Sequence, residues 1–347
     1  MDLKDEIQCC SELNIDWSLI DNKTILITGA TGMVGSYLIR ALLTRNFRRN
    51  LSTKIIAVGR SRKKFLTRFS DCKQIETVTF LQQDVQAPLE VSENIDYIFH
   101  MASNTHPRIY AQKPIDTIMS NVTGTCHLLE LAAKNPGCRF VFLSSGDVYG
   151  DNIGGKKYLE EKDCGYLDCN MLRAGYTESK RVCEALCNAY REEKKVDFVT
   201  ARLCRLYGPT MQLDDSRAIS QFIMNAARKE NIILKSAGTQ IFSHCYVYDA
   251  VSALLYILVN GISGEVYNVA GGTNAYSLRE IAEMLAQIGG CQVEAGCSTP
   301  EEKKGGGSFQ NVLLSTEKLE GIGWRAEVAM KDGLRHTVDC VRKKEFL

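Results

Sequence analysis

The sequence predicts an α/β fold: a doubly wound parallel sheet with a smaller, mostly C-terminal second domain. Three observations predict it. Short runs rich in β-branched and aromatic residues alternate with longer segments of helical period. Those runs are continuously apolar, as expected for strands buried on both faces of a parallel sheet. In the last third of the chain, helical segments are separated by turns that contain Gly and Thr, which indicates a change of architecture.

The alternating pattern places the strands and the helices that connect them. Each helical segment is long enough to cross from one parallel strand to the next. We expect strands at Thr24–Thr28, Lys54–Val58, Thr77–Leu81, Tyr97–His100, Phe140–Ser144, Phe198–Leu203 and Glu265–Val269. We expect crossover helices at Met33–Thr44, Ile115–Ala133 and Tyr176–Glu193.

The chain divides into an extension and two domains. Residues 1–22 form a polar N-terminal extension, which is either a helix docked on the surface or a lid. Residues 23–207 and 235–270 form the sheet domain, and residues 208–234 and 271–342 form the smaller domain. A ligand is expected in the cleft between the smaller domain and the edge of the sheet. The expected helices of the smaller domain are Ala218–Lys229, Leu278–Ile288 and Val328–Val341.

Composition and charge exclude several classes of protein. Of 347 residues, 45% are hydrophobic and 24% are charged, which is typical of a globular chain and not of a disordered or collagen-like one. With 42 Lys and Arg against 41 Asp and Glu, the net charge is +1, so no nucleic-acid partner is expected. The longest apolar stretch, Ala250–Val259, is shorter than the roughly 20 residues of a membrane span. The acidic start Met1–Glu6 lacks the order of a signal peptide, so we expect a cytoplasmic protein without membrane contact.

The 14 cysteines and 5 histidines do not follow the spacing of metal sites. No Cys-x-x-Cys pair occurs, and no histidines stand at zinc-finger spacing, so we expect no bound metal. A chain of this size needs no disulfides to be stable, and reduced thiols are therefore expected. Cys183 and Cys187 are four residues apart, share a helix face and are expected to pack as small apolar residues.

A glycine-rich turn follows the first expected strand and opens into a helix. In Thr28–Gly35, Gly29 permits a tight turn, Gly32 allows the backbone to approach a pyrophosphate, and Gly35 lets the helix pack on the strand. The helix N-terminus then stabilises the negative charge of the ligand. A tight turn without a ligand is the alternative, but the strand before and the helix after favour a Rossmann dinucleotide-binding loop. Its other expected coenzyme contacts are Thr31, Met33 and Val34.

The end of the second expected strand bears on the choice between NAD and NADP. After Gly59 the chain continues with Arg60, Ser61 and Arg62, so no carboxylate stands ready for a ribose 2′-hydroxyl. Two arginines could instead bind a 2′-phosphate, which favours NADP over NAD. Asp84, after the third strand, is either a contact of the adenine edge or a turn cap.

Tyr176 and Lys180 are four residues apart in a helical run and therefore share one face. A phenol titrates near 10, so using it as a base at neutral pH requires a shift of about three units, or roughly 4 kcal/mol. One ammonium about 4 Å away, at an effective dielectric near 20, supplies roughly that free energy. Ser145, at the carboxyl end of the fifth strand, adds a hydroxyl that can stabilise a developing alkoxide.

With these features in place, the sequence resembles the extended short-chain dehydrogenase/reductases that rebuild nucleotide sugars. The likeness covers the chain from Lys23 to about Val341. Its motifs are the glycine loop, His100–Ser103, Asn121–Thr125, Ser144–Gly150, Tyr176 with Lys180, Arg202–Pro209 and Tyr246–Asp249. The stretches that look most like UDP-glucuronate decarboxylases are Pro114–Thr117, Arg173–Arg181 and Asp215–Arg217.

The resemblance implies roles for individual residues. Ser145 and Tyr176 would hold the sugar 4-hydroxyl, and Lys180 would bind the nicotinamide ribose and acidify the phenol. Hydride would leave carbon 4 and give a 4-keto sugar, from which loss of carbon dioxide, elimination of water or inversion becomes accessible. The further expected coenzyme contacts are Asp84, Val85, Met101, Ala102 and Ser103.

Two departures from the family pattern concern the substrate. Dehydratases carry an Asp-Glu pair after the hydroxyl residue and decarboxylases a Ser-Glu pair, whereas this chain has Gly146 followed by Asp147, a shortened version of the decarboxylase glutamate. Where the family usually places an arginine on the nucleotide diphosphate, this chain has Phe242. Either Arg205 or Arg217 takes over that charge, or the substrate differs.

Three further residues are expected near the sugar, and two of them, His106 and Arg217, have an alternative role. Thr105 and His106 follow the fourth strand, and His106 is either an acid catalyst or a loop residue packed on Pro107. Arg217 is either a phosphate or carboxylate contact or a surface helix residue.

The leading expectation is therefore an NAD(P)-dependent nucleotide-sugar enzyme most like a UDP-glucuronate decarboxylase. A 4-epimerase and an NADPH-dependent 4-keto reductase are alternatives with the same fold, and a non-catalytic NAD(P)-sensing protein is an alternative of another class. The resemblance also implies a homodimer formed through the helices expected at Ile115–Ala133 and Tyr176–Glu193.

Overall fold

The computed structural model describes residues 2–105, 112–152, 154–272, 275–297 and 312–343. It confirms the predicted parallel sheet, which has seven strands in the order β10-β6-β5-β4-β1-β2-β3. All six pairings are parallel. The strands are β1 (Thr24–Thr28), β2 (Lys54–Gly59), β3 (Thr79–Gln82), β4 (Tyr97–His100), β5 (Arg139–Ser145), β6 (Asp197–Leu203) and β10 (Val266–Val269).

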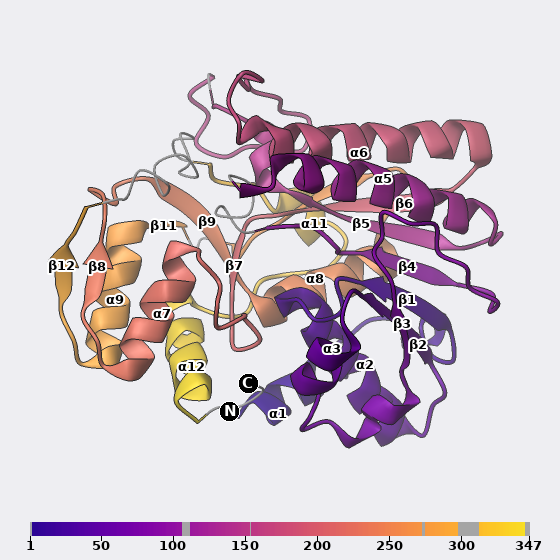
Figure 1. Cartoon of the computed structure of the whole chain (residues 1–347), viewed down its shortest axis with the longest axis horizontal. Helices are drawn as coiled ribbons and strands as arrows, with labels where there is room; N and C mark the ends of the chain where they lie inside the picture. Colours follow the sequence, from indigo (N-terminus) through magenta and orange to yellow (C-terminus); the bar gives the residue numbers. More distant parts are fainter. Residues whose placement is uncertain (1, 106–111, 153, 273–274, 298–311, 344–347) are drawn as a thin grey trace.

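Helices cover both faces of this sheet (Figure 1). One face carries α5 (Pro114–Ala133) and α6 (Ala174–Lys194), and the other carries α2 (Met33–Arg49) and α8 (Val247–Asn260). Successive residues of β1 alternate between two cores, with Ile25 and Ile27 on the side of α2 and α8 and Leu26 on the side of α5 and α6. This alternation explains why the strands read as unbroken apolar runs.

The strand order reverses between β1 and β4, and this reversal positions the site. The strands β2 and β3 follow β1 on one side of the sheet. The next strand along the chain, β4, pairs with β1 on its other side. The carboxyl ends of these two strands are the position at which sheets of this kind bind ligands. Thr28 ends β1 beside His100, which ends β4.

A three-stranded sheet leads from the large sheet toward the smaller domain. It consists of β11 (Ala275–Ser277), β9 (Ile241–Tyr246) and β7 (Arg205–Tyr207). These strands were not predicted from the sequence. Their pairing partners lie about 30 to 40 residues apart along the chain, and β7 and β11 have three residues each, so neither carries a periodic signal.

The helices of the predicted smaller domain lie on the left in Figure 1, together with a short parallel pair of strands. Its predicted helices are observed with shifts of up to two residues at their ends, as α7 (Ala218–Arg228), α9 (Leu278–Gly289) and α12 (Met330–Lys343). The parallel pair of strands consists of β8 (Ile232–Leu234) and β12 (Val293–Ala295). A short helix, α11 (Glu317–Glu320), precedes α12 along the chain. The domain boundaries drawn from the sequence stay a prediction.

The N-terminal extension contains the helix α1 (Leu3–Cys10), which contacts α2 and α8. Its Leu3, Ile7 and Cys10 are buried in the core on that side of the sheet. Smaller elements complete the fold: α3 (Arg62–Arg68) and the 3₁₀ turns η1 (Trp17–Leu19), η2 (Lys73–Thr77) and η3 (Gly146–Tyr149).

All fourteen cysteines have free thiols. Within the described residues, no helix has the length and apolar character needed to cross a membrane. The described part of the chain also contains no group of three or more His, Cys, Asp or Glu side chains that could hold a metal ion. The cytoplasmic location expected from the sequence stays a prediction.

Candidate active site

The glycine loop joins β1 to α2 with very little space around its backbone. Gly29 has φ +67°, and a Cβ there would lie 2.9 Å from the Met101 carbonyl carbon at the end of β4. A Cβ on Gly35 would lie 2.5 Å from the Gly29 carbonyl oxygen. Gly32 is the N-cap of α2 and supplies no capping side chain. The N-terminal backbone amides of a 17-residue helix are therefore available to an anion such as a pyrophosphate.

Hydrogen bonds hold the ends of β1 and β4 together at this loop. The Thr28 hydroxyl accepts from the backbone N–H groups of Met101 (3.1 Å) and Ala102 (3.0 Å) and contacts His100 Nδ1 at 2.9 Å. Burial and the Lys180 charge lower the pKa of His100 to about 3. His100 is therefore neutral at physiological pH and acts as a structural connector between the strands.

The remaining predicted coenzyme residues follow the carboxyl ends of β2, β3 and β4. Arg60 Nη1 is 3.9 Å from Asp84 Oδ2, and both side chains are largely exposed. Val85 packs against Gly124 of α5, where an added Cβ would be 2.8 Å from Val85 Cγ2. Ser103 Oγ donates to Asn121 Oδ1 at 2.8 Å, which ties the segment after β4 to α5.

Ser145 and Tyr176 come together at the carboxyl end of β5. Tyr176 lies in the first turn of α6, is 7% exposed and hydrogen-bonds the Ser145 side chain. The Ser145 hydroxyl also accepts the backbone N–H of Asp147 at 3.2 Å, which fixes the start of η3. The predicted serine and tyrosine thus form one polar unit at the edge of the sheet.

Lys180 is buried one helical turn after Tyr176. Its ammonium donates to the Leu143 carbonyl at 2.7 Å and lies 4.8 Å from the centre of the Phe142 ring. Burial lowers the pKa of Lys180 to about 8, while the Glu184 carboxylate acts in the opposite direction. The lysine is therefore mainly an ammonium at neutral pH.

The groups that shift the pKa of Tyr176 differ from the one expected from the sequence, which was the Lys180 ammonium. Burial, and then the Asp147 carboxylate, raise the pKa of the phenol. The groups that lower the Tyr176 pKa are the Ser145 hydroxyl and the Arg217 guanidinium. Lys180 directs its ammonium to a backbone carbonyl, so phenolate formation in this site needs additional positive charge from a ligand.

Arginine side chains lie near Tyr176 and Asp147. The Arg205 guanidinium lies 3.5 Å from the centre of the Phe242 ring, because β7 pairs with β9 so that Arg205 stands beside His244. Arg205 interacts electrostatically with Asp147, Arg173 and Arg217. Among the described residues, no carboxylate forms an ion pair with Arg205 within 4 Å.

Arg217 is held by a buried neighbour. Its Nε donates to Asp215 Oδ2 at 2.9 Å, and the Asp215 side chain is 2% exposed. Thr105 is exposed just beyond β4. His106 lies outside the described residues.

Three charged residues near these groups were not assigned roles from the sequence. Arg173 directly precedes α6, and Glu184 and Arg202 form an ion pair behind Lys180. Arg202 belongs to the motif Arg202–Pro209, and Glu184 is four residues after Lys180, so helix spacing was the available signal.

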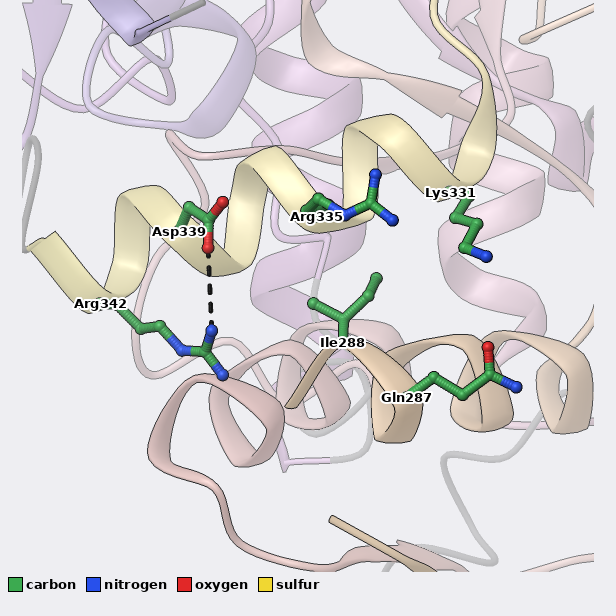
Figure 2. Close-up of a pocket in the computed structure, with 6 residues that line it drawn as sticks. All are labelled: Gln287, Ile288, Lys331, Arg335, Asp339 and Arg342. Atoms are coloured by element: carbon green, nitrogen blue, oxygen red, sulfur yellow. Dashed lines mark ion pairs between the residues drawn. The ribbon is translucent and has the colours of Figure 1, made fainter. Parts of the chain in front are cut away.

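A separate cavity of about 400 Å³ lies in the smaller domain, between α9 and α12 (Figure 2). Its lining includes none of the predicted site residues. Arg342 from this cavity donates to the Ala226 carbonyl at 3.1 Å and pairs with Asp339 at 3.8 Å. Since Ala226 is in the last turn of α7, this arginine satisfies a helix end, which is a structural role.

The fold and this edge define a dinucleotide-binding α/β protein with a Ser-Tyr-Lys site. Residues 25–270 match the model of the NAD dependent epimerase/dehydratase family, and the chain belongs to that family. It is an NAD-dependent enzyme of the nucleotide-sugar epimerase/dehydratase type.

Curated relatives and solved structures agree with this assignment. UDP-glucuronic acid decarboxylase 6 of Arabidopsis thaliana is 30% identical over 318 residues, which are 90% of this chain and 87% of the relative. UDP-glucuronic acid decarboxylase 1 of Xenopus tropicalis is 30% identical over 93% of this chain and 73% of its own. The UDP-glucose 4-epimerase of Thermotoga maritima, bound to UDP-glucose, has a TM-score of 0.76 at 20% identity, over 92% of this chain and 99% of its own. The dTDP-glucose 4,6-dehydratase of Bacillus anthracis, in complex with NAD, has a TM-score of 0.76 at 22% identity, over 93% and 97%.

Proposed function

We propose that this enzyme oxidises carbon 4 of a nucleotide sugar and acts as a UDP-glucuronate decarboxylase. The observation that carries the proposal is the buried Tyr176 hydroxyl, hydrogen-bonded to Ser145 and one helical turn from Lys180. The relatives named UDP-glucuronic acid decarboxylase support this choice among the reactions of the family.

The loop residues fit a nicotinamide dinucleotide. Gly29 and Gly35 leave no space for a Cβ, and Gly32 exposes the amides of α2, as the close approach of a pyrophosphate requires. When bound, the coenzyme supplies the acceptor and later the donor of a hydride at carbon 4. Lys180, with its buried ammonium, would hold the ribose next to the nicotinamide.

Ser145 and Tyr176 move the proton. The Tyr176 phenolate accepts the proton of the sugar 4-hydroxyl as hydride leaves carbon 4, and the Ser145 hydroxyl donates a hydrogen bond to the oxygen. In a 4-keto uronic acid the carboxylate is β to the ketone, so carbon dioxide leaves and the electron pair forms an enolate. A proton from solvent then enters at carbon 5, relayed through the Asp147 carboxyl group, which takes up one proton for each one that it donates. As hydride returns to carbon 4, the Tyr176 hydroxyl gives its proton back to the oxygen, so each turnover consumes one solvent proton and releases one carbon dioxide.

The substrate is an anion in this proposal. Arg205 interacts electrostatically with Arg173 and Arg217, and like charges held close together are stabilised by a bound diphosphate or carboxylate. Arg205 stands over Phe242, the position at which the sequence analysis found the usual diphosphate arginine missing. We assign Arg205 to the diphosphate for this reason.

A preference for NADP over NAD is part of the proposal. The end of β2 has no carboxylate for a 2′-hydroxyl, and Arg60 is exposed there. Asp84, 3.9 Å from Arg60, opposes an added phosphate, so the expected preference is modest. Separate measurements of the dissociation constants for NADP and NAD decide this point.

The test is incubation of the purified protein with a panel of nucleotide sugars. Release of carbon dioxide from UDP-glucuronate without net change in the coenzyme supports decarboxylation. Stoichiometric consumption of NADPH by a 4-keto sugar would instead identify the reductase, which the exposed Arg60 favours. Inversion at carbon 4 without loss of mass would identify an epimerase.

A homodimer is also proposed. The outer faces of α5 and α6 carry apolar side chains that are 37–76% exposed: Ile115, Ile118, Met119 and Val182. The two helices lie side by side on one face of the sheet (Figure 1), and a second copy of the same pair could cover these side chains by symmetry.

A further inference from the structure

A buried ion pair lies directly behind the proposed catalytic groups. Glu184 is one helical turn after Lys180 on α6, and Arg202 is the β6 residue paired in register with Ser144 of β5. Arg202 Nη2 donates to Glu184 Oε2 at 2.7 Å and Nε donates to Oε1 at 3.0 Å. Each side chain is only 12% exposed.

This pair is connected to the strand end that carries Ser145. Ser144 Oγ donates to Glu184 Oε1 at 2.5 Å. The preceding residue, Leu143, accepts the Lys180 ammonium at 2.7 Å through its carbonyl. Glu184 and Lys180 lie on the same face of α6. Glu184 holds the Ser144 side chain and Lys180 holds the Leu143 carbonyl, so both contacts fix the backbone next to Ser145.

Arg202 reaches further into the structure below the site. Its guanidinium lies 4.8 Å from the ring centre of Tyr149 in η3, and its Nη1 donates to the Glu161 carbonyl at 2.8 Å. Tyr149 in turn donates its hydroxyl to Asn268 Oδ1 at 2.6 Å. The arginine has many fixed partners, so its charge stays in one place when Lys180 changes protonation.

Stability alone gives a weak reason for such a pair. Removing two charges from water costs several kcal/mol per ion, and apolar residues of similar volume are often as stabilising as a buried ion pair. The position of the pair next to Lys180 offers a functional reason, because a buried ammonium depends on the charges around it.

The charged and titratable groups that face Lys180 come from three elements. On α6 they are Cys183, Glu184 and Cys187, and on β4 the neutral His100. Arg202 on β6 faces Glu184 from the other side. Of these groups, Glu184 is the carboxylate, and Arg202 is the cation that partly cancels it.

We propose that Glu184 and Arg202 are positioning residues of the reaction: the Glu184 carboxylate keeps the Lys180 ammonium charged, and Arg202 limits that effect. This inference rests on the proposed catalytic role of Ser145, Tyr176 and Lys180. It predicts that removal of the Glu184 carboxylate moves the titration of Lys180 to lower pH. Removal of the Arg202 guanidinium moves it to higher pH.

The test compares Glu184→Gln with Arg202→Gln. Without the carboxylate, the remaining Arg202 charge disfavours the ammonium, so the alkaline limb of the pH–rate profile moves by about one unit to lower pH. Without the guanidinium, the remaining Glu184 charge favours the ammonium, and the limb moves to higher pH. Glu178→Gln, on the same helix but at a more exposed position paired with Arg181 at 3.4 Å, is the matched control and leaves the limb in place.

A second readout does not depend on turnover. The Nζ resonance of Lys180 in ¹⁵N-lysine-labelled full-length protein, assigned with Lys180→Arg, reports its titration directly. Opposite shifts for the two variants are expected, and Glu184→Asp should return the titration toward that of the parent protein. Shifts in the same direction for Glu184→Gln and Arg202→Gln, an unchanged Lys180 titration in both, or a titration in folded Glu184→Asp that moves as far as in Glu184→Gln would overturn the inference.

The two readouts separate this inference from the proposed function. If the parent protein turns over no nucleotide sugar but the NMR titrations move in opposite directions, the proposed reaction is wrong and the charge pair acts as described. If turnover is observed and the titrations do not move, the pair is structural and only this inference fails.

Discussion

The Tyr176 phenol combines burial with a neighbouring carboxylate, and both raise its pKa in the protein alone. A base of this kind becomes useful only when a bound ligand brings positive charge, as the oxidised nicotinamide ring does. We predict that Tyr176→Phe lowers turnover by about 10²- to 10⁴-fold, because the proton acceptor is removed. Coenzyme affinity, measured by calorimetry, should stay within a few-fold of the parent. A non-catalytic sensing protein would show no turnover to lose and an unchanged response to the coenzyme.

Arg205 is the second residue whose role can be measured alone. We predict that Arg205→Ala raises the KM for the nucleotide sugar at least tenfold and changes kcat less, because a charged hydrogen bond to the diphosphate contributes about 1.5–3 kcal/mol. Arg228→Ala, an exposed arginine at the end of α7, serves as the control. Equal effects of the two substitutions would mean that Arg205 acts only through overall charge.

At this scale the sequence predicted which residues lie at this edge of the sheet better than it predicted the groups that surround them. Ser145, Tyr176 and Lys180 followed from spacing, since a four-residue interval fixes a helix face and a strand end fixes an edge. The stacking of Arg205 on Phe242 did not follow, because it depends on the pairing of β7 with β9 across about forty residues. The carbonyl that receives the Lys180 ammonium was equally inaccessible, because backbone acceptors leave no mark on a sequence.

Among the elements, α2 depends most closely on its glycines. We predict that Gly35→Ala weakens coenzyme binding and lowers the free energy of unfolding by about 1–3 kcal/mol, because the new methyl group would lie 2.5 Å from the Gly29 carbonyl oxygen. Gly154→Ala is the matched control, since no atom lies within 4 Å of the added carbon. Fluorescence titration with the coenzyme and urea denaturation measure the two effects. A tolerated Gly35→Ala would show that α2 can move away from the turn.

The helix α8 contains a buried carboxyl that links stability to pH. Asp249 accepts the backbone N–H groups of Glu327 (2.9 Å) and Val328 (3.1 Å), and burial raises its pKa to about 7 from an ordinary 3.8. Because the pKa of Asp249 is higher in the folded state than in the unfolded state, its protonated form stabilises the fold. This contribution is fully present below pH 3.8 and is lost as the pH rises through 7.

We therefore predict that the parent protein loses stability relative to Asp249→Asn between pH 5 and pH 8. The interval from pH 5 to the folded pKa of Asp249 spans about two pH units. Each unit changes the free energy of unfolding by ~1.4 kcal/mol, so the relative loss is about 3 kcal/mol. Urea denaturation at the two pH values measures it, and the constant offset of the substitution cancels in the difference. Parallel pH dependence of the two proteins would show that Asp249 is ionised throughout.

Elements with a strong period were predictable, and elements set by tertiary contacts were not. The seven strands of the large sheet and the three crossover helices were found within a few residues at their ends, because burial on two faces leaves continuous apolar runs. The short helix α3 was missed; its seven residues include four Lys or Arg and bury only Phe65. Its start depends on Ser61, whose side chain accepts the Lys64 N–H.

Across the whole molecule, the N-terminal extension links the two domains. The buried Glu6 of α1 accepts the hydroxyl of Tyr37 on α2 at 2.8 Å and that of Tyr246 at 2.9 Å, and its Oε2 lies 3.0 Å from His336 Nδ1 on α12. One carboxylate thus contacts the helix that carries the glycine loop and a helix of the smaller domain. The sequence showed this segment only as a polar extension, since one glutamate among the other polar residues of α1 does not reveal its three partners.

The homodimer is the remaining prediction at this scale, and it concerns the outer faces of α5 and α6. Ile115 is 76% exposed and Met119 45% exposed, although both are apolar and one helical turn apart. Exposed apolar side chains at this spacing form a stripe that water solvates poorly, and a second copy could bury it. The double substitution Ile115→Asp with Met119→Asp places charges in that stripe and should convert a dimer into a 38.7 kDa monomer in sedimentation equilibrium. Ile262→Asp, at a residue that is 64% exposed in the turn after α8, should leave the dimer intact. A parent protein that sediments only as the monomer would refute the dimer and leave the apolar stripe of α5 and α6 uncovered in solution.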